Sequence, residues 1–217
     1  MTPDAVLNRK CKGIRRASLL SFGPGHRRRQ WTKVFPFGVI HATNPLMSKN
    51  HMRLRPLTHE DAQEFQRLRL HGLQESPSSF GSSHEEEVHK TPDQVRQHIA
   101  GSVERVFLGL FAGAELVGMV GVGREQGLKE QHIAFIRSMY VAPGTRGQGA
   151  GRQLLDAALQ QARAWHGVEQ VTLSVTASNE AALRLYQAAG FMEVGRMPRA
   201  LKVGTSYFDE LMMVRNT

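Results

Sequence analysis

From Met52 onward, apolar and polar residues recur with the regular spacing of strands and helices. Residues 52–57 alternate apolar and basic side chains, which predicts a half-buried strand. Residues 60–73 place apolar side chains on one face after Thr58, which predicts an amphipathic helix with a threonine cap. Thr91 and Pro92 predict the start of another helix, because proline suits the first helical turn.

Longer apolar runs follow in the second half of the chain. Branched and aromatic runs bounded by glycine or proline predict strands, and runs with one apolar face predict helices. The predicted elements are, in order, strands at 105–111, 116–122 and 133–141, a helix at 151–165, a strand at 171–175, a helix at 179–189, and strands near 191–196 and 207–214. This order predicts an α/β fold with a mixed sheet and helices on both of its faces.

The first 51 residues lack this periodicity and carry the excess charge. The chain has 28 Lys and Arg against 19 Asp and Glu, a net charge of +9. Because residues 1–51 hold ten of the basic and one of the acidic residues, residues 52–217 hold 18 of each and are neutral. We therefore expect a basic, poorly ordered leader at 1–51 and one domain at 52–217. The leader could instead be a transit peptide, a nucleic-acid-binding tail, or an over-extended start ahead of Met47 or Met52.

Several classes of protein are excluded by composition. No run of 18 apolar residues occurs, so no membrane-spanning helix is predicted. The single cysteine, Cys11, excludes an internal disulfide and a multi-cysteine metal site. His84 and His89 are five residues apart rather than four, and no other histidine spacing predicts a metal site. We expect a cytoplasmic protein without a metal ion.

A glycine-rich segment between the strand at 133–141 and the next helix carries the clearest chemical signal. Gly147, Gly149 and Gly151 alternate with other residues, so the backbone can turn sharply and direct amide groups at an oxyanion. The helix N-terminus adds unpaired N–H groups and a partial positive charge. Arg146 and Arg152 add counter-charge, so a diphosphate fits this loop chemically.

Two common nucleotide loops do not fit the spacing. An ATP-binding loop starting at Gly144 requires Lys and Ser or Thr where Ala150 and Gly151 stand. A dinucleotide fingerprint starting at Gly149 requires a third glycine where Leu154 stands. A glycine-rich turn that binds nothing remains an alternative on this segment alone.

The segment resembles the coenzyme A signature of the GNAT superfamily of N-acetyltransferases. That signature, Arg/Gln-x-x-Gly-x-Gly/Ala, stands here as Arg146-Gly147-Gln148-Gly149-Ala150-Gly151, and residues 138–143 look like the family's fourth strand. A second family pattern, Asn-x-x-Ala-x-x-x-Tyr followed by Gly-Phe, stands as Asn179, Ala182, Tyr186, Gly190 and Phe191. The resemblance covers about 52–217 and implies a GNAT-like, mostly antiparallel mixed sheet.

The spacing of the second pattern would place its residues on one face of a helix. Asn179, Ala182 and Tyr186 stand at i, i+3 and i+7, and the first and last are about 10.5 Å apart along a helix. Such a helix could contact both the pantetheine arm and its thiol end. The resemblance implies that Tyr186 protonates, or donates a hydrogen bond to, the departing thiolate. The alternative is a tyrosine that only packs in the core.

The resemblance implies transfer of an acetyl group from acetyl-CoA, as co-substrate, to a primary amine by direct attack in a ternary complex. Residues 52–217 contain no cysteine, so the domain cannot form an acetyl-cysteine intermediate. Backbone N–H groups at 138–141 would polarise the thioester carbonyl. The pantetheine arm would pair with Met139 and Val141 and with residues 173–175. The coenzyme would also contact the loop residues, Arg152 and Asn179.

The sequence leaves the proton acceptor and the amine open. Candidate bases are Glu85, Glu86, Glu87, Glu130 and His132, and a water relay is equally compatible. Segments 73–91 and 201–208 are expected to line the acceptor site, without a charge pattern that selects a small molecule, a peptide or a protein N-terminus. The alternative function is a non-catalytic acyl-CoA sensor on the same fold. A homodimer is possible, and neither a membrane nor nucleic acid is expected to bind the domain.

Overall fold

The computed structural model describes residues 52–217. The expected leader at 1–51, with Cys11, lies outside the described residues, so the boundary at 51/52 stays a prediction. The strands are β1 (Met52–Pro56), β2 (Arg105–Ala112), β3 (Glu115–Arg124), β4 (Ile133–Val141), β5 (Gln170–Thr176), β6 (Met192–Val203) and β7 (Ser206–Asn216). The α-helices are α1 (Ala62–Glu75), α2 (His84–Glu87), α3 (Pro92–Ile99), α4 (Ala150–Ala164) and α5 (Glu180–Ala188), and the 3-10 turns are η1 (His59–Asp61), η2 (Pro77–Ser79) and η3 (Pro143–Thr145).

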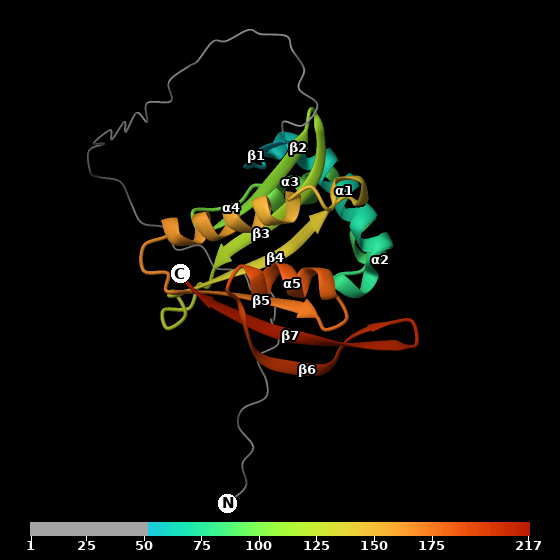
Figure 1. Ribbon diagram of the computed structural model, residues 1–217. Helices are drawn as coiled ribbons and strands as arrows, with labels where there is room; N and C mark the ends of the chain where they lie inside the picture. Colours follow the sequence, from blue (N-terminus) through green and yellow to red (C-terminus); the bar gives the residue numbers. More distant parts are fainter. Residues whose placement is uncertain (1–51) are drawn as a thin grey trace, which may run out of the picture. The chain divides into compact units, whose positions relative to one another are not determined.

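The seven strands form one mixed, mostly antiparallel sheet in the order β1-β2-β3-β4-β5-β7-β6. Only β4 and β5 pair in parallel. Helices α4 and α5 cover one face, and α1, α2 and α3 lie on the other (Figure 1). The expected fold class is therefore confirmed. None of the helices within 52–217 is long and apolar enough to cross a membrane.

Each face of the sheet has its own hydrophobic core. On one face, α4 buries Leu154, Leu155 and Leu159 against β2, β3, β4 and β5. On the other, α1 buries Phe65 and Leu68 together with aromatic residues of β2. The i, i+3 and i+4 spacing of the apolar residues places them on one stripe of each helix, which is why these sequences form helices that pack on the sheet.

Strand β6 continues beyond the predicted end at 196 and reaches Val203. Pro198 lies within this strand, although proline cannot donate a ladder hydrogen bond. In the structure β6 is an edge strand, and its register against β7 is interrupted between Met197 and Leu201, with Arg199 at φ 52°. The interruption accommodates Pro198, and the resulting long hairpin runs from β6, which ends at Val203, into β7, which begins at Ser206.

Strand β4 is shaped by two local irregularities. Its pairing with β5 covers only Ile133–Phe135 against Gln170–Thr172, and beyond these residues the two strands diverge (Figure 1). Its pairing with β3 shifts register, since Gly121 lies opposite Arg137 but Met119 lies opposite Tyr140. Ser138 and Met139 thus share one position opposite β3, which defines a β-bulge, and Ser138 has φ 55°. The bulge lies where the strands separate.

Candidate functional site

One cavity of about 360 Å³ brings the two sequence motifs together. It lies beside the divergence of β4 and β5. The glycine-rich loop contributes Arg146, Gly147 and Gly151, and α5 contributes Leu185 and Tyr186. The other lining residues are Ser76, Ser79, Phe80, Met139, Tyr140, Val141, Asn179, Ala181 and Ala182. Segments predicted separately from the sequence therefore face the same space.

The glycines of the loop meet different physical requirements. Gly147 and Gly149 have φ of 76° and 81°, a conformation that other residues adopt only with strain. A Cβ at either position would meet no atom within 4 Å, so their backbone is uncovered. Gly151 lies in the first turn of α4, where a Cβ would come within 3.3 Å of Leu185 in α5. The uncovered peptide groups and the helix N-terminus fit the diphosphate of coenzyme A.

The guanidinium of Arg146 is bound to Glu75 at the end of α1. Its two terminal nitrogens donate to the two carboxylate oxygens at 2.7 and 2.6 Å, and its Nε donates to the carbonyl of Val141 at 3.0 Å. The hydroxyl of Tyr140 donates to the same carboxylate at 2.7 Å. The Arg146 guanidinium, with help from Tyr140, lowers the pKa of Glu75 to about 2. The sequence analysis expected the Arg146 guanidinium to face a diphosphate, whereas in the structure it is paired with the carboxylate of Glu75.

The remaining loop residues lie outside the lining of this cavity. Gln148 donates to the carbonyl of Gly144 at 3.0 Å and holds the loop closed on itself. Gly149 is the N-cap of α4, and Ala150 is buried at the start of that helix. Arg152 is exposed on the first turn of α4 and pairs with Asp156 at 2.8 Å. Contacts of these residues with the coenzyme stay predictions.

Tyr186 is 7% exposed, and its hydroxyl lies 3.6 Å from the sulfur of Met139 in β4. Burial raises its pKa to about 12, so the phenol keeps its proton at neutral pH. A protonated phenol that faces a cavity beside the diverging strands can donate to an anion formed there. This geometry fits the role expected for Tyr186.

Asn179 is the N-cap of α5, a role that the spacing argument did not identify. Its side-chain oxygen accepts from the N–H of Ala182 at 3.1 Å, and its amide nitrogen contacts the hydroxyl of Ser79 at 3.3 Å. Asn179 also lines the cavity. It therefore starts the helix that carries Tyr186 and ties it to η2, while contact with pantetheine stays a prediction.

A second cavity, of about 600 Å³, lies between the end of α1, the segment around α2 and the β6–β7 hairpin. Phe80 lines both cavities. The lining combines apolar residues with His84, Glu85, Glu86 and Lys202. The two segments that the sequence suggested for the acceptor, 73–91 and 201–208, thus line one cavity beside the first.

The five candidate bases are not equivalent. Glu85 and Glu86 line the second cavity. Burial opposes ionisation of Glu87, but Lys90 and Arg69 outweigh it and lower its pKa, so Glu87 is committed to an internal ion pair. Glu130 and His132 precede β4, and His132 is seven residues from Met139, about 23 Å along an extended strand at 3.3 Å per residue. Neither Glu130 nor His132 lines either cavity, so a role for them as the proton acceptor stays a prediction.

The sequence did not identify Glu210 of β7. It lies directly opposite Thr176 of β5, so the two side chains share a face of the sheet. The hydroxyl of Thr176 donates to the carbonyl of Ser78 in η2 at 2.5 Å, which places Glu210 on the η2 side. Burial raises the pKa of Glu210. Glu210 is therefore a further candidate base, for which no sequence motif gave a signal.

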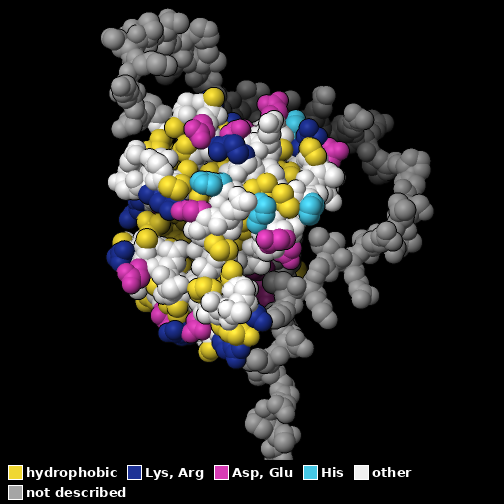
Figure 2. All heavy atoms as spheres, turned by 90° about the vertical axis from the view of Figure 1, so that its right-hand side faces the viewer, with side chains coloured by type: hydrophobic (Ala, Val, Ile, Leu, Met, Phe, Trp, Pro, Cys, Tyr) yellow, Lys and Arg dark blue, Asp and Glu magenta, His cyan; other side chains and the backbone are white. Residues whose placement is uncertain are grey.

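On the face drawn in Figure 2, Lys and Arg side chains are interspersed with Asp and Glu, and no patch of one sign is visible. This mixture agrees with the neutral charge of residues 52–217. Within these residues, no group of three or more His, Cys, Asp or Glu side chains is arranged to hold a metal ion.

Comparisons with known proteins agree with this geometry. The sequence model of the Acetyltransferase (GNAT) family matches residues 70–191. The chain is 37% identical over 97 residues to the N-alpha-acetyltransferase RimI of Mycobacterium tuberculosis, a match that covers 45% of the chain and 58% of RimI. The chain thus spans less than two thirds of this curated relative.

Two solved structures share the fold. One is the acetyltransferase of the GNAT family from Streptococcus pneumoniae, with a TM-score of 0.67, 22% identity, and coverage of 77% of this chain and 100% of that chain. The other, from Salmonella typhimurium, was solved with its cofactor acetyl-CoA and has a TM-score of 0.64, 19% identity, and coverage of 77% and 94%.

Proposed function

Since the chain belongs to the GNAT acetyltransferase family, we propose that it transfers the acetyl group of acetyl-CoA to a primary amine of a small molecule, peptide or protein. The observation that carries the proposal is the cavity shared by the glycine-rich loop and Tyr186. Two motifs that start 33 residues apart, at Arg146 and Asn179, line one space beside the separated strands, as a bound thioester carrier requires.

The proposed contacts of acetyl-CoA follow the lining of this cavity. The backbone from Gly147 to Gly151 and the first turn of α4 would hold the diphosphate. The edges of β4 and β5 that do not pair with each other would take the pantetheine amides, with Met139 and Val141 on one side. The relative solved with acetyl-CoA supports this choice of co-substrate.

In the proposed reaction, acetyl-CoA supplies an activated acetyl group as a thioester. The amine nitrogen forms a bond to the carbonyl carbon, the carbon–sulfur bond breaks, and the sulfur leaves with the electron pair. Backbone N–H groups at the β4 bulge would stabilise the negative charge on the carbonyl oxygen. Tyr186 would donate a hydrogen bond to the thiolate, or transfer its proton and regain one from solvent, and a base would take the proton that the amine loses.

The proposed acceptor site is the second cavity, which borders the first at Phe80. Glu85, Glu86 and Glu210 are the proposed bases, directly or through a water molecule. RimI is named as an N-alpha-acetyltransferase, which supports testing peptide N-termini among the acceptors. A homodimer and a cytoplasmic location stay predictions from the sequence.

The test combines binding and turnover. Acetyl-CoA should raise the melting temperature, and a panel of amino acids, polyamines and peptides should release free thiol with at least one acceptor. A thermal shift without thiol release would indicate the non-catalytic sensor. Absence of a shift at millimolar acetyl-CoA would rule out both functions.

A further inference from the structure

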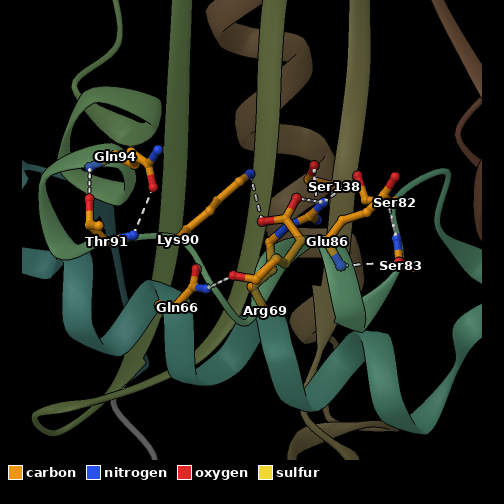
Figure 3. Close-up of polar contacts among 10 residues, drawn as sticks. Gln66, Arg69, Ser82, Ser83, Glu86, Lys90, Thr91, Gln94 and Ser138 are labelled. Carbon is orange, nitrogen blue, oxygen red and sulfur yellow. Dashed lines mark hydrogen bonds and ion pairs between the residues drawn. The ribbon is translucent and has the colours of Figure 1, made fainter.

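Arg69 of α1 is a buried cation in contact with the bulge of β4. Its side chain is 6% exposed. Its guanidinium donates to the hydroxyl of Ser138 at 3.4 Å and to the hydroxyl of Ser82 at 3.2 Å, and it pairs with Glu87 at 3.3 Å. Figure 3 shows Arg69 extending from α1 toward Ser82 and Ser138.

The charge of Arg69 is not fully paired. Its contacts with Ser138 and Glu87, at 3.4 and 3.3 Å, are longer than ordinary hydrogen bonds, and its Nε has no partner among residues 52–217. A buried charge is costly unless it is fully paired, and a buried ion pair is weak evidence for stabilisation. The carboxylate of Glu87 also has a closer partner, Lys90 at 2.8 Å. The position of Arg69 thus calls for a reason besides stability.

The contact with Ser138 supplies that reason. Ser138 has φ 55°, a strained backbone conformation for a residue other than glycine, and it belongs to the β-bulge. The strands separate at this point, so the direction of the backbone N–H groups at 138–141 depends on how the bulge is held. Arg69 reaches the bulge from α1, and through Ser82 it also reaches the segment that lines the acceptor cavity.

From this geometry we infer that Arg69 is a positioning residue for acetyl transfer. By its contact with Ser138, Arg69 fixes the β4 bulge so that the N–H groups of the bulge point at the thioester carbonyl. By its contact with Ser82, Arg69 also connects the bulge to the lining of the second cavity. Arg69 itself touches neither the acetyl group nor the amine. This inference rests on the proposed function, since it assigns a role within the same reaction.

A lysine at position 69 separates this role from a structural one. Lysine keeps the positive charge beside Glu87, but it lacks the fork that reaches Ser138 and Ser82 together. Arg69→Lys should therefore keep the melting temperature near that of the wild type and still lower kcat. Arg69→Met should lower kcat by about tenfold to a hundredfold, below the loss that follows removal of an oxyanion donor, with the acetyl-CoA affinity within about twofold. Arg67→Met is the matched control on an exposed part of α1 and should leave kcat unchanged.

Removal of the Ser138 hydroxyl tests the same interaction if Arg69→Met does not fold. Ser138→Ala should lower kcat in the same direction by a few fold. The double variant Arg69→Lys/Ser138→Ala should have nearly the same kcat as Arg69→Lys alone, because the two substitutions remove the same interaction. Wild-type kcat in both Arg69→Lys and Ser138→Ala, or fully additive losses, would overturn the inference while the wild type still turns over.

Hydrogen exchange gives a readout that does not depend on turnover. Peptides covering 136–141 should exchange faster in Arg69→Lys and Ser138→Ala than in the wild type and in Arg67→Met, because the bulge is less firmly held. Unchanged exchange in both variants contradicts the inference. If the wild type releases no thiol with any acceptor, the proposed function fails, and the exchange rates still decide whether Arg69 holds the bulge.

Discussion

Glu75 and Arg146 are 71 residues apart in the chain and form two hydrogen bonds, at 2.7 and 2.6 Å. This pair fastens the end of α1 to the glycine-rich loop. Tyr140 donates to the same carboxylate, so β4 joins the connection. The strands and helices around the first cavity are thus held at the point where the loop turns into α4.

Replacement of Glu75 by glutamine should destabilise the protein at neutral pH. The pKa of Glu75 is lowered to about 2 in the folded state, so its contribution is present above its unfolded pKa of about 4.5 and is lost as the pH falls toward 2. Because the pair is partly exposed, we expect a loss of about 1 kcal/mol at pH 7 rather than the full value of the shift. Denaturant unfolding at pH 7 and pH 4 measures the effect. A difference from the wild type that grows as the pH falls contradicts this assignment.

Replacement of Tyr186 by phenylalanine should slow turnover without weakening acetyl-CoA binding. The buried phenol has a pKa of about 12, so it is a proton donor throughout the neutral range. Loss of general acid catalysis typically costs on the order of a hundredfold or more in rate. Steady-state kinetics and titration of acetyl-CoA separate the two effects. Equal losses in kcat and affinity would indicate that Tyr186 only packs.

Alanine substitutions in the loop should depend on backbone conformation. Gly149 has φ 81°, so Gly149→Ala is strained by about 1–2 kcal/mol and should weaken acetyl-CoA binding. Gly144 is the matched control, because it does not have positive φ and an added Cβ meets nothing within 4 Å. Gly144→Ala should bind acetyl-CoA like the wild type. Similar affinities for the two variants would exclude the loop as the binding element.

The pH profile should identify the proton acceptor. A base must be ionised to act, so kcat/KM falls as the pH drops through its pKa. Burial raises the pKa of Glu210, which moves this acidic limb to higher pH than for an exposed glutamate. The substitution that removes the limb and lowers kcat/KM, among Glu85→Gln, Glu86→Gln and Glu210→Gln, identifies the base, and a limb at raised pH that only Glu210→Gln removes assigns it to Glu210. A limb that persists in Glu210→Gln assigns the base elsewhere.

The fold and the loop were predictable because their signals are local. Periodic apolar residues fixed the order of the elements, and β4 was predicted at its observed bounds, 133–141. The helix that carries Tyr186 was also predicted, but Asn179, which was expected within that helix, is its N-cap. Each motif consists of residues that lie within twelve positions of each other.

The contacts around the loop were not predictable, because they join distant residues. Glu75 meets Arg146 across 71 residues and Arg69 meets Ser138 across 69, and neither pair has a sequence spacing of its own. The bulge at Ser138 arises from the register between β3 and β4, which the residues of β4 alone do not reveal. The same limit applies to the candidates Glu130 and His132, which are close to β4 in sequence but precede its first residue, Ile133, and line neither cavity.

A crystal structure of the protein with bound coenzyme A tests the central claim most directly. The account predicts the diphosphate against the backbone of Gly147 to Gly151 and the sulfur within hydrogen-bond distance of the Tyr186 hydroxyl, between β4 and β5. A coenzyme bound at another surface, or a sulfur directed away from Tyr186, would contradict it.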